Sequence, residues 1–187
     1  MLEFVIIALG AAAIIAIVVI YNGLVAKRQM ASNGWSDIDV QLKRRADLIP
    51  PLVATVQAYA THERQLFEDV AAKRTAALAA GDDTAQRGAA ESALSKPVGR
   101  LIALAEAYPD LKANQNFLDL QNELSDTEDK IEMARRFFNG AVRELNTAVE
   151  TFPANLVAAL FGFRTRQYFE IDPADAATPK LNIGPQA

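Results

Sequence analysis

The chain has 187 residues, 51% of them hydrophobic and 22% charged, which is enough for one compact domain and a separate apolar segment. A formal net charge of −4 gives no sign of the basic surface that nucleic-acid backbones require, so no nucleic-acid partner is expected. The absence of cysteine excludes disulfide bonds and thiolate chemistry, but it does not indicate a compartment.

Residues 1–26 predict a transmembrane anchor. The run FVIIALGAAAIIAIVVIY, residues 4–21, carries no ionisable group except one tyrosine, and it covers roughly 27 Å at about 1.5 Å per residue. A cleaved signal peptide is the alternative, but Glu3 stands where such peptides carry cations. Because Lys27 and Arg28 follow the span, the positive-inside rule predicts a single pass with the N-terminus outside and the remainder in the cytoplasm.

Beyond the anchor, hydrophobic periodicity predicts three long helices and a short fourth, over residues 32–80, 84–107, 113–152 and 154–163. The IPP at residues 49–51 predicts a kink or break in the first helix, and the GDD at residues 81–83 predicts a turn after it. No strand pattern of period two extends beyond four residues. The predicted fold is therefore all-α, an N-terminal transmembrane helix followed by an antiparallel bundle.

The predicted domain organisation follows from these elements. Residues 1–26 form the anchor and residues 27–170 form the helical bundle. The last segment, residues 171–187, is rich in Pro, Ala and Gly and has little to bury, so it is predicted to be a flexible tail.

Charged side chains interrupt the apolar stripes of the long helices. In GWSDIDVQLKRRADLIPPLV, residues 34–53, Arg45 occupies a position on the stripe that contains Trp35, Ile38, Leu42, Ile49 and Leu52. Such groups either lie at the rim with the charge in water or form ion pairs. If the first helix is unbroken and parallel to the third, Lys73 lies level with Glu128, so a Lys73–Glu128 pair is predicted.

The same length arithmetic leaves two apolar stretches uncovered within one molecule, Trp35–Leu52 and Phe138–Phe152. Because such stretches are seldom bare, either further copies of the protein or the short fourth helix would cover them. Arg45 would then select a pairing register or, with its neighbouring cations, meet lipid phosphate, although a solvated face is the commoner role of such a cluster. The residues predicted to mediate interaction are Trp35, Arg45, Phe138, Phe152, Leu156, Leu160 and Phe161.

No group of residues predicts catalysis. His62 is the only histidine, and adjacent helical residues point in different directions, so it cannot share an ion with Glu63. Carboxylates such as those of Asp37 and Asp39 would bind a divalent cation only if two helices brought acidic groups together. There is no Gly-rich phosphate loop and no nucleophile beside a base. We therefore expect no enzymatic activity, no cofactor and no metal.

Several segments resemble the LemA family of bacterial membrane proteins. In chain order they are YNGLV, WSDIDVQLKRRADLIPPLV, YATHE, AYPDLKANQNFLDLQNELSDTEDKIEMARRFFNGAVRELN and FPANLVAALFGF. The sequence departs from the family pattern at Pro51, where Asn is usual, and at Gly34, where a larger residue usually precedes the tryptophan. The resemblance implies a membrane-anchored helical bundle whose biochemical role is mostly undefined, and no enzymatic activity is attached to the family, so none is carried over. Some relatives take part in forming magnetosome membranes, and others are grouped with cell-envelope functions.

Two functions of different classes fit these expectations. The first is a structural or scaffolding protein of the envelope that self-associates beside the inner membrane and contacts lipid and other envelope proteins. The alternative is a monomeric adaptor or regulator that binds another membrane protein through the helix at residues 152–163.

Overall fold

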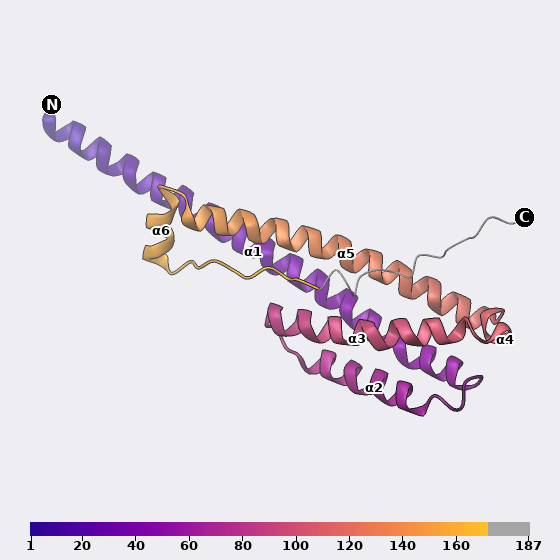
Figure 1. Cartoon of the computed structure of the whole chain (residues 1–187). Coiled ribbons are helices and arrows are strands. Elements are labelled where there is room, and N and C mark those ends of the chain that lie inside the picture. The colour runs from indigo at the N-terminus through magenta and orange to yellow at the C-terminus, as the bar shows by residue number, and fades with distance from the viewer. Residues whose placement is uncertain (172–187) are drawn as a thin grey trace, which may run out of the picture. The chain divides into compact units, whose positions relative to one another are not determined.

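A computed structural model describes residues 1–171, in which every regular element is a helix (Figure 1). The helices are α1 (Leu2–Gln57), α2 (Arg64–Ala79), α3 (Thr84–Ala105), α4 (Pro109–Lys112), α5 (Gln115–Glu150) and α6 (Ala154–Phe161). The prediction of an all-α fold is confirmed, with a long apolar N-terminal helix that packs with further helices into a bundle. Apart from its first residue, the predicted tail lies outside the described residues.

The chain divides into two compact units. Unit 1 comprises Met1–Ile38 and Met133–Tyr168, and unit 2 comprises Asp39–Glu132 and residues 169–171. Helices α1 and α5 each contribute residues to both units.

The prolines of the first helix do not end it, so the predicted break at residues 49–51 is wrong, while the alternative of a kink stays a prediction. Pro50 and Pro51 lie inside α1, which continues to Gln57. A proline leaves the carbonyl group four residues earlier without its helical donor, which for Pro50 is the carbonyl of Ala46. Nε of Arg74, in α2, donates a hydrogen bond to this Ala46 oxygen at 2.6 Å. The lost backbone bond is thus replaced from a neighbouring helix, and the helix is maintained.

The chain instead reverses over residues 58–63, before α2 begins. The turn predicted at GDD is confirmed. Gly81 has a φ of 64°, and the Asp83 side chain caps α3 by accepting a hydrogen bond from the backbone N–H of Gln86 at 2.8 Å. Helices α2 and α3 consequently lie side by side (Figure 1).

Because of this early reversal, α5 runs antiparallel to the part of α1 in unit 2. Asn114 donates a hydrogen bond to the Tyr59 hydroxyl at 3.1 Å, and Arg45 contacts Glu128 at 2.9 Å. From the first contact to the second, the residue number falls by fourteen on one side, from Tyr59 to Arg45, and rises by fourteen on the other, from Asn114 to Glu128. Opposite changes of this kind are what an antiparallel pair requires. The core of unit 2 forms around this arrangement from Ile49, Leu52, Val56, Ala60, Phe67, Val70, Ala77, Leu94, Val98, Leu101, Ala105, Leu111, Phe117 and Leu124.

In unit 1, α1 and α5 also cover each other. The rings of Trp35 and Phe138 pack with centroids 5.5 Å apart, and both side chains are buried. A Cβ on Gly34 would meet the Phe138 Cα at 3.1 Å, which accounts for a glycine before this tryptophan. The expectation of two uncovered apolar stretches is therefore wrong for most of their length, because the stripe residues from Trp35 to Leu52 and from Phe138 to Leu145 are buried within one chain. At the end of the second stretch, Phe152 is exposed as expected.

Extended segments after α6 attach to each unit separately. In unit 1, the Asn146 side chain donates to the Arg166 carbonyl at 2.9 Å and accepts from the Arg166 backbone N–H at 2.8 Å. In unit 2, Phe169 is buried, and the Glu170 carbonyl lies where a Cβ on Gly88 would stand. Glycine at position 88 therefore allows the chain to pass directly over α3.

Candidate functional site

A cluster of buried charges joins α1, α3 and α5 in unit 2. Arg45 is 3% exposed, and its guanidinium contacts both carboxylate oxygens of Glu128, at 2.9 and 3.3 Å, and the carboxylate of Glu91. Arg87 extends the cluster, with contacts of 3.2 Å to Glu91 and 3.2 Å to Asp39. Two guanidinium groups thus pair with three carboxylates, and the Lys43 ammonium group, 2.7 Å from the Asp39 carboxylate, supplies the third positive charge.

The electrostatics of the cluster keep Arg45 charged. Burial by itself lowers the pKa of the Arg45 guanidinium, but the negative charges of Glu128 and Glu91 and their hydrogen bonds outweigh burial, so its pKa is raised above the ordinary value. A guanidinium that holds its proton this firmly cannot act as an acid or a base near neutral pH. The arrangement is suited to fixing the register of three helices.

This cluster corrects two predictions. Arg45 does not lie on an exposed segment facing neighbours or lipid headgroups, because it is buried inside unit 2. The cation in contact with Glu128 is Arg45, whereas Lys73 is exposed. The predicted Lys73–Glu128 pair assumed that α1 continued through residues 58–63, and the reversal there places α5 antiparallel to α1 instead.

The other candidate site is the exposed face of α6, in unit 1. Pro153 precedes the helix and Gly162, with a φ of 72°, ends it. Val157 and Ala158 point inward, where they pack with Leu24 of α1. The opposite face exposes Leu156 and Leu160, at 62% and 73%. Phe152, just before the helix, is 74% exposed, and Phe161, although it contacts α1, is still 51% exposed.

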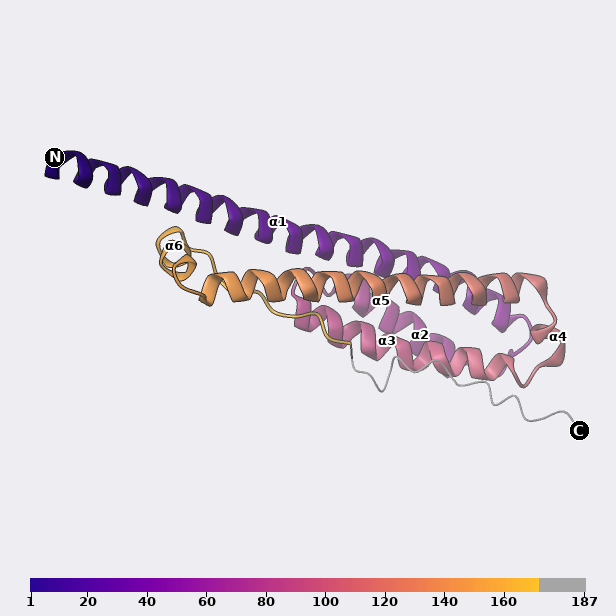
Figure 2. The same ribbon diagram turned by 90° about the horizontal axis from the view of Figure 1, so that it is seen from above.

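Aromatic contacts hold α6 against one level of α1. The Tyr21 ring lies 4.9 Å from the Phe161 ring and 5.6 Å from the Phe163 ring, in edge-to-face geometry. The guanidinium carbon of Arg28 stands 5.1 Å from the centre of the Phe163 ring. In Figure 1, α6 runs across the direction of α1, and Figure 2 shows it almost end on.

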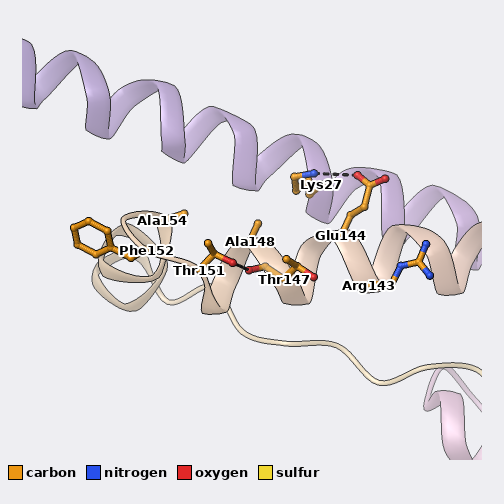
Figure 3. Close-up of a pocket in the computed structure, with 8 residues that line it drawn as sticks. All are labelled: Lys27, Arg143, Glu144, Thr147, Ala148, Thr151, Phe152 and Ala154. Carbon is orange, nitrogen blue, oxygen red and sulfur yellow. Dashed lines mark hydrogen bonds and ion pairs between the residues drawn. The ribbon is translucent and has the colours of Figure 1, made fainter.

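A groove of about 440 Å³ opens where α1, the end of α5 and the start of α6 meet (Figure 3). The ammonium group of Lys27 contacts the Glu144 carboxylate at 3.0 Å across it. The hydrogen bond from Lys27, and then its charge, lower the pKa of Glu144 below the ordinary value. The rest of the lining consists of Arg143, Thr147, Ala148, Thr151, Phe152 and Ala154.

The apolar part of α1 meets the requirements of a membrane span. Its most apolar 18-residue window has a mean hydropathy of 3.0, and none of that window is buried against the rest of the chain. The only helix within residues 1–171 that is long and apolar enough to cross a bilayer is α1.

The predicted interaction residues therefore separate into two groups. Trp35, Arg45 and Phe138 are interior residues. Phe152, Leu156, Leu160 and Phe161 share an exposed surface, which we call the α6 face. Within the described residues, no three His, Asp or Glu side chains are grouped closely enough to hold a metal ion.

Sequence reasoning missed Arg87 and Glu91. Both continue the stripe of Leu94, Val98 and Leu101 backward along α3 at steps of three and four, and both are buried. A pair of opposite charges on the apolar face of a helix was the available signal.

The fold and the unburied apolar helix define the class: a helical protein whose N-terminal helix has the length and composition of a membrane anchor. The chain belongs to the LemA family, whose model matches residues 34–183. It is 25% identical over 179 residues to magnetosome protein MamQ of Magnetospirillum gryphiswaldense, covering 82% of this chain and 66% of that protein.

Other relatives show similar identity. Magnetosome protein MamQ 2 of Paramagnetospirillum magneticum is 26% identical over 189 residues, covering 86% of this chain and 70% of its own length. Protein LemA of Metamycoplasma hominis is 26% identical over 163 residues, covering 86% and 74%. The chain spans about two thirds of the length of the Magnetospirillum gryphiswaldense protein.

Proposed function

We propose that this protein is a structural, scaffolding protein of the bacterial envelope that self-associates within the inner membrane and performs no catalysis. Its bundle lies in the cytoplasm and its N-terminus outside. Lys27 and Arg28, which directly follow the span, support this orientation, because cations accumulate on the cytoplasmic side of a membrane. A reporter fused after Asp172 tests it, since activity only on the outer side of the membrane would reverse the assignment.

The observation that carries self-association is the surface of the span. Ala8, Ala12 and Ala16 recur at four-residue steps, so they share one face of α1, and all three are exposed. Small residues at this spacing let two helix backbones approach closely in a bilayer, where van der Waals packing drives association. Because the seams in the two units are covered within one chain, the span is the better-supported contact between copies.

A structural role is further supported by the disposition of the charges. The most deeply buried ionisable groups, Arg45, Arg87 and Glu91, contact one another and their neighbours. Groups held in this way stabilise the helices and do not face a substrate.

The proposal is tested by substituting one alanine of the shared face. Ala12→Leu widens this face, so it is expected to convert large assemblies in lipid nanodiscs or mild detergent to single copies. Gly10→Leu is the matched control, because Gly10 lies on the opposite side of α1 and an added Cβ there has no neighbour within 4 Å. A wild-type protein that is already a single copy, measured by light scattering, would refute self-association.

The alternative function is that of a monomeric adaptor or regulator, and the exposed α6 face is the observation that favours it. A large apolar surface beside a membrane span is suited to capturing the helix of another membrane protein. Deletion of residues 152–163 would then abolish co-purification of that partner. If co-purification is unchanged by the deletion, the adaptor function through this helix is excluded.

A further inference from the structure

We infer that α6 lies in the interfacial layer of the bilayer, with lipid acyl chains covering the α6 face. The inference rests on the membrane anchoring of α1 in the proposed function. It adds a second contact between unit 1 and the same membrane, through residues that do not belong to the span.

The level of α6 along α1 supports this placement. A bilayer requires about 20 apolar residues of helix, and the apolar run of α1, residues 4–21, has nearly this length and ends at Tyr21. Tyrosine is enriched at the boundary between hydrocarbon and headgroups. Because Tyr21 contacts both Phe161 and Phe163, α6 is fixed at this boundary level.

The direction of α6 supports it further. Because α1 crosses the bilayer, a helix that runs across α1 lies along the membrane plane, and both views of unit 1 show α6 in this direction (Figures 1 and 2). An interfacial helix needs this orientation in order to bury one face in the acyl chains. In Figure 3 the Phe152 ring points to the left of the view, the side on which the N-terminal, apolar part of α1 lies.

The chemistry of the segment fits lipid on both sides of the boundary. From Thr151 to Phe163 there is no ionisable side chain, so nothing charged would enter the hydrocarbon with the α6 face. Cations flank the segment at headgroup level: Arg28 stands over the Phe163 ring, and Arg164 follows Phe163 directly. Anionic lipid phosphates would pair with these guanidinium groups.

Lipid is favoured over protein as the occupant because the α6 face continues the surface of the span. The side chains that α6 packs against include Ile20 and Tyr21, which end the apolar run, and Leu24 one turn further along α1. A protein partner on this face would have to displace lipid that the anchor already brings there.

The absence of cysteine provides a direct test with the full-length chain. Single cysteines introduced by Leu160→Cys and Leu156→Cys are labelled with an environment-sensitive dye, and the proteins are reconstituted into vesicles of phosphatidylethanolamine and phosphatidylglycerol. Met133→Cys is the matched control, because Met133 is an equally exposed apolar residue of unit 1, on α5 far from α6. Ile14→Cys, in the middle of the apolar run, reports on the anchor itself.

We expect the labels at Leu160 and Leu156 to emit at shorter wavelength than the label at Met133. They should lose fluorescence to lipids that carry a quencher near the top of the acyl chain, whereas the label at Ile14 should respond most to a quencher near the chain end.

Three results would overturn the inference. The labels at both α6 positions could be as accessible to water as the label at Met133, which leaves the face for a protein partner absent from the vesicles. They could be shielded without lipid quenching, in a manner that depends on protein dilution, which indicates a second copy. Failure of the Ile14 label to be quenched would overturn the anchor, and with it the proposed function, which distinguishes the two failures.

Discussion

Replacement of Arg45 by methionine should destabilise the bundle of unit 2 by about 3 kcal/mol, near the lower end of the usual cost of removing one member of a buried ion pair. Arg45 is 3% exposed and is the cation between Glu91 and Glu128. Its loss leaves the buried Glu91 carboxylate with Arg87 alone. The Glu128 side chain is 41% exposed and can turn to water, which keeps the cost at the lower end of the range.

The assay is urea unfolding of the full chain in mild detergent, followed by far-ultraviolet circular dichroism at constant protein concentration. Arg44→Met is the matched control, because this neighbouring arginine is exposed and its loss should change the free energy of unfolding by less than about 0.5 kcal/mol. The double variant Arg45→Met/Glu91→Met removes the orphaned carboxylate and should recover part of the loss. Equal unfolding free energies for Arg45→Met and Arg44→Met would refute the structural role of the cluster.

Three further predictions test the remaining contacts. Gly88→Ala should destabilise the protein by about 1–3 kcal/mol, because its Cβ meets the chain that passes over α3, whereas Gly99→Ala in the same helix should be neutral or stabilising in thermal unfolding. Asn146→Ala should speed trypsin cleavage after the cations of residues 164–166, because the side chain holds that segment through two hydrogen bonds. Glu144→Gln should remove a pH dependence of the free energy of unfolding. Because the pKa of Glu144 is lowered in the folded protein, its contact with Lys27 stabilises the fold at pH values above the ordinary glutamate pKa of 4.5, and this stabilisation is lost as the pH falls below 4.5.

Each of these has a clear contrary outcome. Equal melting temperatures for the two glycine variants would show that the chain does not pass closely over position 88. Wild-type cleavage rates in the asparagine variant would show that other contacts hold the segment. If the free energy of unfolding changes with acid pH in the same way in the wild-type protein and in Glu144→Gln, the Glu144 carboxylate contributes nothing to stability.

The elements with local signals could be predicted from the sequence. Helix α3 was predicted to begin at Thr84, and it does so because GDD supplies a turn glycine and a capping aspartate. The short helix after Pro153 and the apolar span of α1 were equally visible, because a proline and a long apolar run are unambiguous.

The turn at residues 58–63 could not be predicted in this way. Its sequence, AYATHE, contains neither glycine nor proline, whereas Pro50 and Pro51 eight residues earlier carry the stronger local signal. The helix persists through the prolines because of Arg74, a residue distant in sequence. This one error inverted the direction of α5 relative to α1, and from it followed the wrong partner for Glu128 and the two apparently uncovered seams.

The candidate site was accordingly predicted in part. The exposed residues of the α6 face were named from the sequence, because a short helix with apolar residues on every side cannot bury them all. The interior position of Arg45 depended on Glu91 in α3, and pairing across helices becomes visible only when their register is known.

The central claim is that copies meet through the membrane span while the helical seams are closed within each chain. Single-cysteine cross-linking in native membranes tests it most directly, with Ala12→Cys on the span and Ala46→Cys in the buried seam of unit 2. The account predicts a disulfide-linked dimer for Ala12→Cys and none for Ala46→Cys. Dimers through position 46, with none through position 12, would contradict it.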